Sequence, residues 1–459
     1  MANSRKLKLS SILSRVENIL REQIQRDDHL VIGLSGGVDS VSLLSILASL
    51  SVQLSFTLSA FHINHGISPN ANKWEKFCLN LCRAHGIPIK ITKLKISRSP
   101  GTSLEAIARD ARYQKFKKLK ADHVILAQHL DDQAETLLLQ MLRGAGVKGL
   151  GAMPVIRNQI SEDGNRPPDT GPQILRPLLN VSRSEIEDYA QENKLHWMTD
   201  ESNNDVSFDR NFLRHKIFPL LEKRFPSYRT TLLRTSRHMA EAGSLLDELA
   251  EYDSKECSIS NKLQIERLRK LSFPRARNLL RYSLAQQSVI LPSAVKLEDI
   301  LGQLFSSRLD TKLHITFGDT EIRCFKGSVH VRRASTLPNK KWKFIWQGEK
   351  QLSFSELGGS VRFLCKKGGG INLQKLKEGP IVVRFRLGGE RIRPDCNRPR
   401  RSLKNLLQEA SFPLWERESL PLLFSGEHLV WVPGIGVDCS FQAGVNDLGL
   451  IVSWHPDPN

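Results

Sequence analysis

The hexapeptide SGGVDS at residues 35–40 has the composition of a loop that holds phosphate groups. It joins an apolar run that begins at His29 to an apolar stretch with helical spacing. Glycines let the backbone approach an anion closely, and N–H groups at a helix N-terminus attract phosphate. An aspartate in that positive field disfavours phosphate unless a cation lies between them. We therefore predict that Asp39 binds a hard cation such as Mg²⁺, directly or through water. The structural alternative is a tight turn in which Asp39 stabilises the helix start.

Two further groups of polar residues lie at the ends of strand-like runs. The first comprises His62, Asn64 and His65, and two histidines beside a nucleotide loop favour ligand binding over a structural role. The second follows Gln128 and His129 and consists of three acids that would open a helix: Asp131, Asp132 and Glu135. Acids there suit the helix dipole. Three acids that face a ligand cleft would equally suit a cation or an ammonium group.

A predicted helix in SLEAIARDARYQKF carries three charged residues on one face. Glu105, Arg109 and Arg112 have i, i+4, i+7 spacing, which places their side chains along one helical stripe. An ion-paired surface stripe would show the same spacing, so the pattern alone leaves both interpretations open.

The elements that must position these residues alternate between strand and helix. Strand-like runs are HLVIGLS, FTLSAFHINH, IPIKIT and HVILAQH, separated by helical periods. This alternation over residues 29–150 predicts an α/β fold, a doubly wound parallel sheet. The helix between the second and third strands would bury Cys78 and Cys82. Ligands of such sheets bind beyond the carboxyl ends of the strands, where the loop and both polar groups lie.

The remaining chain suggests two more domains. The stretch 161–172 has the composition of an exposed loop, and Ser182 with Glu185 forms a capping box before a helix through Asn193. Helical periods dominate residues 225–310, and a Gly-rich, strand-rich pattern follows. We expect three domains: a catalytic nucleotide-binding domain at 1–224, a helical domain at 225–345, and a small mixed α+β domain at 346–459.

The charge balance favours a polyanionic partner. Lysine and arginine total 67 against 48 aspartate and glutamate, a net charge of +19. Nucleic acid is the first expectation, and a solvated surface that only aids solubility is the alternative. Cations concentrate in one segment: Arg384, Arg386, Arg391, Arg393, Arg398, Arg400, Arg401 and Lys404. Glycines and prolines among them suit an RNA helix, which proteins read mainly by backbone and shape.

The cysteines and the hydropathy of the sequence argue against disulfide-rich, metal-cluster and membrane-spanning proteins. The seven cysteines form no CxxC pair, so we predict no disulfide framework and no zinc or iron–sulfur site. No apolar run reaches the roughly 18 residues that span a bilayer, and the first residues lack the apolar core of a signal peptide. We expect a cytoplasmic protein without a membrane partner. Its oligomeric state stays open, with a dimer as one option.

The SGGVDS loop resembles that of the N-type ATP-pyrophosphatase (PP-loop) superfamily, whose members cleave ATP between its α and β phosphates. Further segments narrow the resemblance, in chain order HINHG, EAIARDARY, QHLDDQAET, LRGAG, RPLLNVSRSEI and HWMTDESNNDVSFDRNFLRHKIFP. With RFRLGGERIRPDCNRPRRSLKNLLQEASFPLWERESLPLLF and VWVPGIGVD they closely resemble the tRNA(Ile)-lysidine synthetases. The likeness covers residues 29–225 and 380–440. Relatives commonly read HHADDQ where this chain has QHLDDQ, a departure at Gln128.

This resemblance implies an enzyme that attaches lysine to the wobble cytidine of an isoleucine tRNA with a CAU anticodon. ATP, with Mg²⁺, would adenylate the oxygen at the cytosine 2-position, and the ε-amine of free lysine would then displace AMP. An amide-like oxygen leaves badly until it is esterified, which is why activation is needed. The partners implied are this tRNA and lysine.

The family's residues carry over to matching positions. ATP phosphates and Mg²⁺ would be held by the loop residues Ser35, Gly36, Gly37, Val38, Asp39 and Ser40, with His62, Asn64 and His65 at the same nucleotide site. Asp132 and Glu135 would engage the lysine or the metal, and one of them would accept the amine proton, because an amine must be neutral to attack. Arg109 or Arg112 would hold phosphates or the lysine carboxylate.

Two sets of residues would bind the tRNA. The first follows the sheet, with buried salt bridges as an equal alternative: Asp200, Asn203, Asp205, Arg210, Asn211 and Arg214. The second lies in the terminal domain and would grip the tRNA near its acceptor stem: Arg391, Arg393, Arg398, Arg400, Arg401 and Lys404.

Two rival functions remain. A tRNA thiolase would adenylate the same type of oxygen and insert sulfur, but it generally needs paired cysteines, and Cys78 and Cys82 lie on an apolar helix face. A non-catalytic RNA-binding protein with a relic nucleotide fold is disfavoured by the intact acids of SGGVDS and DDQAET. AMP release that depends on tRNA and lysine together would separate the three.

Overall fold

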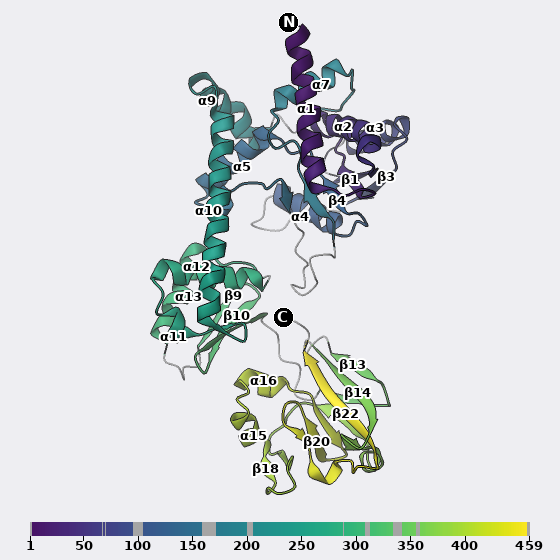
Figure 1. The fold of residues 1–459 in the computed structure, drawn as a ribbon, viewed down its shortest axis with the longest axis vertical. Helices are drawn as coiled ribbons and strands as arrows, with labels where there is room; N and C mark the ends of the chain where they lie inside the picture. Colours follow the sequence, from purple (N-terminus) through teal and green to yellow (C-terminus); the bar gives the residue numbers. More distant parts are fainter. Residues whose placement is uncertain are drawn as a thin grey trace. The chain divides into compact units, whose positions relative to one another are not determined.

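The computed structural model describes residues 2–66, 68, 70–94, 104–157, 171–199, 205–287, 289–307, 313–333, 342–354 and 359–456, and only the backbone of 2–11, 104–106, 333 and 456. Asp200, Asn203 and most of the 161–172 loop lie outside these residues, as does the side chain of Glu105. The chain forms two compact units, Met1–Asp253 and Ser254–Asn459. Each is described by itself (Figure 1).

The first unit is built on a six-stranded sheet of order β3-β2-β1-β4-β6-β5. All neighbours pair in parallel except β5, which runs antiparallel at one edge. The strands are β1 (His29–Gly33), β2 (Thr57–Asn64), β3 (Ile89–Lys93), β4 (His123–Ile125), β5 (Ile156–Arg157) and β6 (Gln173–Leu175). The predicted parallel sheet is confirmed.

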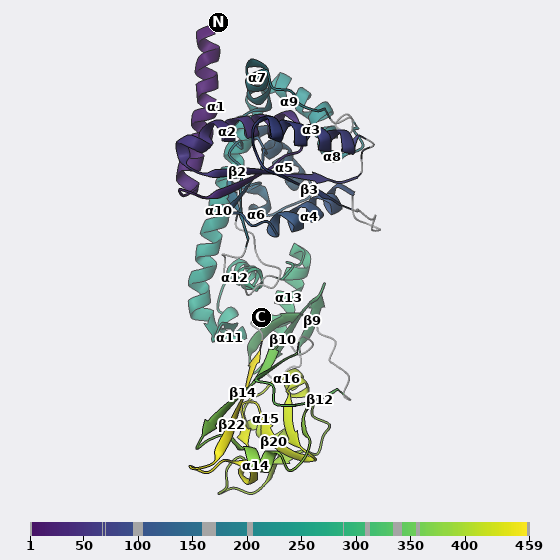
Figure 2. The same cartoon turned by 90° about the vertical axis from the view of Figure 1, so that its right-hand side faces the viewer.

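Helices cover both faces of this sheet, as a doubly wound fold requires. In β1, Leu30 and Ile32 pack into one core cluster while Val31 packs into another on the opposite face, because side chains alternate along a strand. Figure 2 shows α2 and α3 on one side of the strands and α4 on the other. The helices of this unit's sheet are α1 (Ala2–Gln23), α2 (Val38–Leu54), α3 (Ala71–Ala84), α4 (Leu104–Lys117), α5 (Leu130–Leu142), α6 (Val147–Leu150) and α7 (Arg183–Glu192).

Local sequence signals explain where several helices begin and what they bury. The capping box before α7 is confirmed: the Glu185 backbone N–H lies 3.3 Å from Ser182 Oγ, and the Ser182 N–H donates to Glu185 Oε2 at 2.8 Å. Cys78 and Cys82 of α3 are fully buried, as predicted. Burial raises the pKa of the Cys78 thiol to about 12 and that of Cys82 to about 11.

The strand order places a topological switch at β1. The chain goes from β1 to β2 on one side, and β4 pairs on the other side of β1. Loops that follow the two strands on either side of such a switch diverge and leave a crevice where ligands bind. The loop after β1 is SGGVDS, and the segment after β4 leads through His129 into α5. The two acid-bearing segments therefore flank the same crevice.

After the sheet, the first unit continues in a series of helical turns. They are α8 (Asp209–Phe212), the π-helical turn η2 (Leu213–Ile217), α9 (Phe218–Arg224) and α10 (Tyr228–Cys257). Leu213, Phe218 and Tyr228 pack against Ala134 of α5 in one apolar cluster. This packing holds the α8–η2 segment against the helix that carries the three predicted acids.

The second unit combines helices with antiparallel sheets. Its main helices are α11 (Ile265–Leu268), α12 (Phe273–Gln286), α13 (Ala294–Ser306), α14 (Leu373–Leu376), α15 (Leu403–Glu409) and α16 (Leu414–Ser419). The expected helices up to residue 306 are present, and a three-stranded sheet, β9 (His314–Phe317), β10 (Thr320–Phe325) and β11 (Ser328–Arg333), follows them. Helical periodicity does not reveal this sheet.

The mixed α+β character expected for the C-terminal part is confirmed. One sheet has the order β12-β16-β19-β20-β21 and the other β13-β14-β22-β15. The strands are β12 (Lys343–Ile345), β13 (Gln351–Phe354), β14 (Gly359–Lys367), β15 (Ile371–Asn372), β16 (Ile381–Arg384), β19 (Leu422–Ser425), β20 (His428–Val432), β21 (Gly436–Val437) and β22 (Leu448–Pro456). No helix among the described residues is long and apolar enough to cross a membrane.

Candidate active site

The SGGVDS loop is held in shape by the hydroxyl of Ser40. Its Oγ accepts from the N–H groups of Ser35 (3.2 Å) and Gly36 (3.1 Å) and donates to the Gly37 carbonyl (3.0 Å). Gly36 has a φ of +90°, and a Cβ there would lie 3.2 Å from Cys78 Sγ. The position therefore favours glycine on both counts. Ser40 acts as the internal brace of the loop, while Gly37 lies at the N-terminus of α2.

Two acids from separate segments converge on one histidine. His129 is 2% exposed, and its Nε2 lies 3.7 Å from Asp39 Oδ1 and 3.5 Å from Asp132 Oδ2. The His129 N–H also donates to Asp132 Oδ2 at 3.1 Å. Burial raises the pKa of Asp39, and the negative charge of Asp132 adds to that rise although His129 and nearby arginines oppose it. The crevice thus gathers more negative charge than its surroundings fully neutralise.

This arrangement fits a divalent cation with few protein ligands. Asp39 Oδ1 is buried without a hydrogen-bond partner in the described part of the chain. Mg²⁺ keeps several waters and commonly takes one or two carboxylates together with substrate phosphates. No group of three or more His, Cys, Asp or Glu side chains among the described residues is arranged to bind a metal. Asp39 and Asp132 are the residues that suit such an ion.

Glu135 lies behind these acids and is fully buried. Arg214 of η2 donates to Glu135 Oε1 through Nη2 (2.6 Å) and Nε (2.9 Å), and its Nη2 lies 3.7 Å from Asp132 Oδ1. Burial and the neighbouring Asp132 raise the pKa of Glu135, while Arg214 opposes that rise. Single π-helical turns occur frequently at functional sites. For Arg214 the geometry favours the buried salt bridge, and direct tRNA contact stays a prediction.

The third acid, Asp131, fastens elements together. Its Oδ1 pairs with Arg229 of α10 at 2.5 Å, and its Oδ2 accepts from the Arg183 N–H at 2.9 Å. These hydrogen bonds outweigh burial and lower the pKa of Asp131. Asp131 therefore joins α5 to α7 and α10, whereas Asp132 lies nearer to the ring nitrogen of His129 that Asp39 approaches.

The polar residues that end β2 brace the nucleotide loop. His62 is 3% exposed, and its Nδ1 lies 2.8 Å from the carbonyl of Leu34, directly before the loop. Asn64 donates to Glu75 of α3 (2.8 Å) and accepts from the Gly66 N–H (2.9 Å). Burial, with Arg112 and His62 nearby, lowers the pKa of His65 to about 4, so its imidazole is neutral at physiological pH. Direct contact of these residues with ATP stays a prediction.

A network beside the crevice surrounds the predicted arginines. Arg109 and Arg112 lie 5.7 and 5.9 Å from the ring of Tyr113, whose hydroxyl accepts from Arg176 at 3.3 Å. Arg176 is 1% exposed and also donates to Gln128 Oε1 at 2.8 Å. Gln128, the departure from the family pattern, therefore serves as a neutral acceptor for a buried cation. Burial would raise the pKa of Tyr113, but Arg176 and its neighbours lower it.

In the basic segment of the second unit, some arginines contact acidic or aromatic side chains and others are largely exposed to solvent. Arg384 and Arg386 lie 3.8 and 3.6 Å from Glu390, and Arg384 also stacks 3.6 Å from the ring of Phe424. The side chain of Arg398 is 71% exposed and that of Arg400 48%. The remaining predicted cations lie at or near the surface: Arg391, Arg393, Arg401 and Lys404.

Counter-charges that the sequence run did not include reduce the positive field of this segment. Arg401 pairs with Glu409, and Arg400 Nη2 lies 3.4 Å from Asp438 Oδ2. Asp438 also accepts from the Arg393 N–H at 2.9 Å. The exposed set is thus anchored by acids from α15 and from the turn after β21, and its outward charge is smaller than the sequence count suggests.

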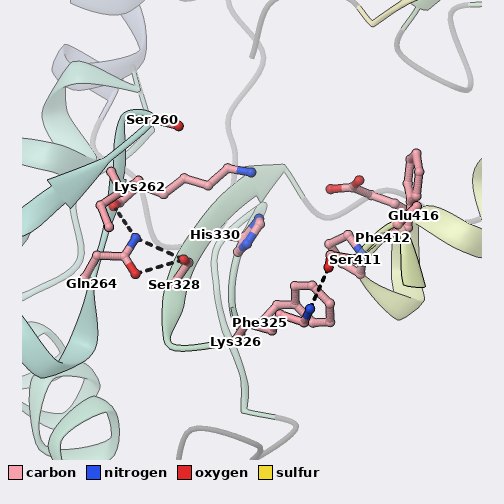
Figure 3. A pocket seen from close by; sticks show the side chains of 13 residues that line it. Ser260, Lys262, Gln264, Phe325, Lys326, Ser328, His330, Ser411, Phe412 and Glu416 are labelled. Carbon is pink, nitrogen blue, oxygen red and sulfur yellow. Dashed lines mark hydrogen bonds between the residues drawn. The ribbon is translucent and has the colours of Figure 1, made fainter. Parts of the chain in front are cut away.

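A separate cavity of about 470 Å³ lies in the second unit (Figure 3). It is lined by Lys262 and His330 on one side and by Phe412 and Glu416 on another, and Lys326 Nζ donates to Ser411 Oγ at 2.5 Å. Burial lowers the pKa of His330 to about 4. None of the predicted catalytic residues borders this cavity, so the acid-bearing crevice of the first unit remains the candidate for chemistry.

The cysteine arrangement bears on the thiolase alternative. Cys78 and Cys82 are buried in the core of the first unit and have raised pKa values, so they are unsuited to carry a cluster or a persulfide. Cys396 and Cys439 do interact, because a hydrogen bond between the two side chains raises the pKa of Cys396, but Cys396 follows β17 (Arg391–Ile392) and Cys439 follows β21 in the second unit, away from the acids of the first unit in the sequence.

Sequence reasoning did not single out three residues that organise the site. His129 links the two acids, Arg176 orients Gln128, and Arg229 holds Asp131. His129 was visible as the N-cap of the acidic helix. Arg176 opens the segment RPLLNVSRSEI that carries the family resemblance, but its role and that of Arg229 were not predicted, because their partners are 48 and 98 residues away.

Three family models match the chain: the PP-loop domain over residues 8–221, the TilS substrate binding domain over 263–330, and the TilS substrate C-terminal domain over 381–454. Among solved structures, the U34-tRNA thiolase NcsA from Methanococcus maripaludis is similar with a TM-score of 0.41 and 19% sequence identity. The alignment covers 51% of this chain and 80% of the thiolase chain.

Full-length relatives are much more similar. The tRNA(Ile)-lysidine synthase of Nitrosomonas europaea is 49% identical over 456 residues, which are 99% of this chain and 98% of that protein. The enzyme of the same name from Azoarcus sp. is 37% identical over 93% of this chain and 92% of that protein. The chain belongs to the tRNA(Ile)-lysidine synthase family.

Proposed function

We propose that this protein uses ATP to attach lysine to the wobble cytidine of an isoleucine tRNA with a CAU anticodon. Adenylation of the cytosine 2-oxygen releases diphosphate, and attack by the lysine ε-amine releases AMP. The observation that carries the proposal is the convergence of Asp39, from the phosphate loop, and Asp132, from α5, on His129. This convergence places Asp39, which is suited to bind ATP through a cation, and Asp132, which is suited to bind an amine, beside the same histidine ring.

The loop supplies the phosphate-binding half of the reaction. Its backbone turns at Gly36 and Gly37 into a 17-residue helix, α2, whose N-terminal N–H groups favour the negative charge of a departing diphosphate. Asp39 would hold Mg²⁺, which when bound neutralises charge on the phosphates. Asp39 Oδ1 has no hydrogen-bond partner in the described residues, so it is free of a competing donor for that task.

Asp132 is the best candidate to receive the lysine amine. Asp131 is committed to Arg229 and the Arg183 N–H, and Glu135 is fully buried against Arg214. Asp132 Oδ2 lies 3.5 Å from His129 Nε2, the same ring nitrogen that Asp39 approaches. We propose that Asp132 attracts the ε-ammonium and accepts its proton, so that the neutral amine attacks the adenylated carbon.

The substrate lysine also carries a carboxylate, and the tRNA carries phosphates. Arg109 and Arg112, placed beside Tyr113 near the crevice, suit either the carboxylate or the ATP phosphates. The exposed arginines of the 384–404 segment suit the tRNA backbone far from the anticodon. We place the activity in the cytoplasm, where ATP, lysine and tRNA are available together.

The decisive experiment is incubation with ATP, Mg²⁺, labelled lysine and CAU-anticodon isoleucine tRNA, followed by mass analysis of the anticodon nucleoside. We expect lysidine, together with AMP and diphosphate, only when tRNA and lysine are both present. Asp132→Asn should retain adenylation of the tRNA and lose lysine transfer. Release of ADP and orthophosphate would contradict the proposed reaction. Normal lysine transfer by Asp132→Asn would contradict the role assigned to Asp132.

A further inference from the structure

Two aromatic rings stand exposed next to the catalytic acids. Phe208 is 39% and Phe212 46% exposed. The Phe212 N–H donates to the Phe208 carbonyl at 2.9 Å, so the two residues are one helical turn apart and lie on one face. We call this pair the aromatic ledge.

The ledge is not needed for the core of the first unit. From the same segment, Leu213 and Phe218 are 3% and 4% exposed and pack against Ala134 and Tyr228. The segment therefore satisfies its packing with the residues that follow Phe212. Apolar residues exposed together, unlike single ones, mark surfaces that bind something.

The ledge is continuous with the catalytic crevice. Phe212 is followed directly by the π-helical turn η2, whose Arg214 donates to Glu135 and approaches Asp132. A second link comes from α5, the helix that carries the acids. Arg143 directly follows the last residue of α5, and its Nη2 lies 3.2 Å from Asp209 Oδ2 in α8. The position of the rings is thus fixed relative to the acids by contacts on both sides.

The chemistry of this surface fits an unpaired RNA loop. Two cations accompany the rings: the side chain of Arg143 is 62% exposed, and Lys216 is also exposed. Single-stranded RNA is bound by aromatic faces that stack on unpaired bases and by cations that contact phosphates. A wobble cytidine that enters the crevice must leave its stack, and the adjacent bases then need another surface to cover them.

Resting on the proposed function, we infer that Phe208 and Phe212 stack on anticodon-loop bases next to the wobble cytidine and hold the loop open while the cytidine enters the crevice. The rings act as positioning residues and take no part in bond formation. Since stacking needs a flat ring, tyrosine should replace phenylalanine here and leucine should not, even though leucine is apolar.

The test uses the full chain and a CAU-anticodon tRNA in which the anticodon adenine is replaced by 2-aminopurine, whose fluorescence reports stacking. Binding by the unaltered protein should change the fluorescence. The double variant Phe208→Leu/Phe212→Leu should lose this change and raise the KM for tRNA on the order of 10-fold or more, with little effect on ATP binding. Phe208→Tyr/Phe212→Tyr should keep both properties.

Two controls separate stacking from folding and from general apolar contact. Leu220→Ala and Phe225→Ala alter residues that are 68% and 59% exposed on nearby α9 and its end, and they should leave the signal and the KM unchanged. Thermal unfolding should be alike for all variants. The inference is overturned if the Leu double variant retains the fluorescence change and KM, or if the Tyr variant loses them as fully as Leu. Because the fluorescence assay does not require lysidine formation, failure of the proposed reaction would be seen separately.

Discussion

The acid-bearing crevice of the first unit and the basic 384–404 segment of the second carry opposite charges in opposite settings. In the crevice, Glu135 is fully buried and Asp39 has a raised pKa. In the basic segment, Arg398 is 71% exposed and the arginines contact acids singly. Buried charges are tuned by their neighbours and so control chemistry, whereas exposed charges are screened by salt and mainly control association. The comparison predicts different consequences for changes in the two regions.

The largest effect should follow Asp39→Asn. The amide keeps the shape of the side chain but loses the charge that would hold a cation against the phosphates. Loss of one electrostatic stabiliser typically lowers turnover about 10²- to 10³-fold. We expect a fall of at least this size in AMP and diphosphate release, measured at saturating ATP. Affinity for tRNA, followed by filter binding, should change little. Full turnover in this variant would show that the crevice does not act through Asp39.

Arg214→Ala should destabilise the first unit strongly. It leaves Glu135 buried without its cation, and breaking such pairs costs about 3–5 kcal/mol. Urea unfolding should show this loss. The double variant Arg214→Met/Glu135→Leu should recover much of the stability, because neither charge remains, yet it should stay inactive. If the double variant were as unstable as Arg214→Ala, the unpaired charge of Glu135 would not be the cause of the lost stability.

Charge reversal in the basic segment should act on binding alone. Arg398→Glu, Arg400→Glu and Arg401→Glu together should weaken tRNA binding and reduce the slope of log affinity against log salt by roughly 2–3. ATP binding should be unaffected. A matched triple change at three exposed residues of β14, Arg362, Lys366 and Lys367, serves as the control. If both triple variants weakened tRNA binding equally, the 384–404 segment would contribute only general positive charge and no specific tRNA site.

The smallest effect concerns pH and stability. Burial raises the pKa of Asp39 above its ordinary 3.8, so the folded protein without cation binds a proton more tightly than the unfolded chain. Its stability should therefore fall as pH rises from 3.8 through the folded pKa. Asp39→Asn removes this contribution, and its melting temperature should exceed that of the unaltered protein above this window. Mg²⁺ with ATP should narrow the difference by stabilising only the unaltered protein. A lower melting temperature for the variant throughout would contradict this.

The comparison also shows where sequence reasoning succeeded. The alternating strands predicted the parallel sheet, and SGGVDS predicted the turn from strand to helix, because hydrophobic period and glycine placement are local properties. The ion pairs could not be predicted in the same way. Asp131 with Arg229, and Glu135 with Arg214, join residues 98 and 79 positions apart, and nothing local distinguishes an arginine that pairs with them from one that faces water.

By itself, the sequence determined the fold class, the phosphate loop, the set of candidate acids and the family. Only the tertiary structure decided what each of those acids contacts: Asp131 joins helices, Glu135 is buried against Arg214, and Asp132 approaches the same nitrogen of His129 as Asp39. Three acids within five residues look equivalent in the chain. In the folded protein they meet different partners, Arg229 for Asp131, Arg214 for Glu135 and His129 for Asp132, and that environment sets what each carboxylate can do.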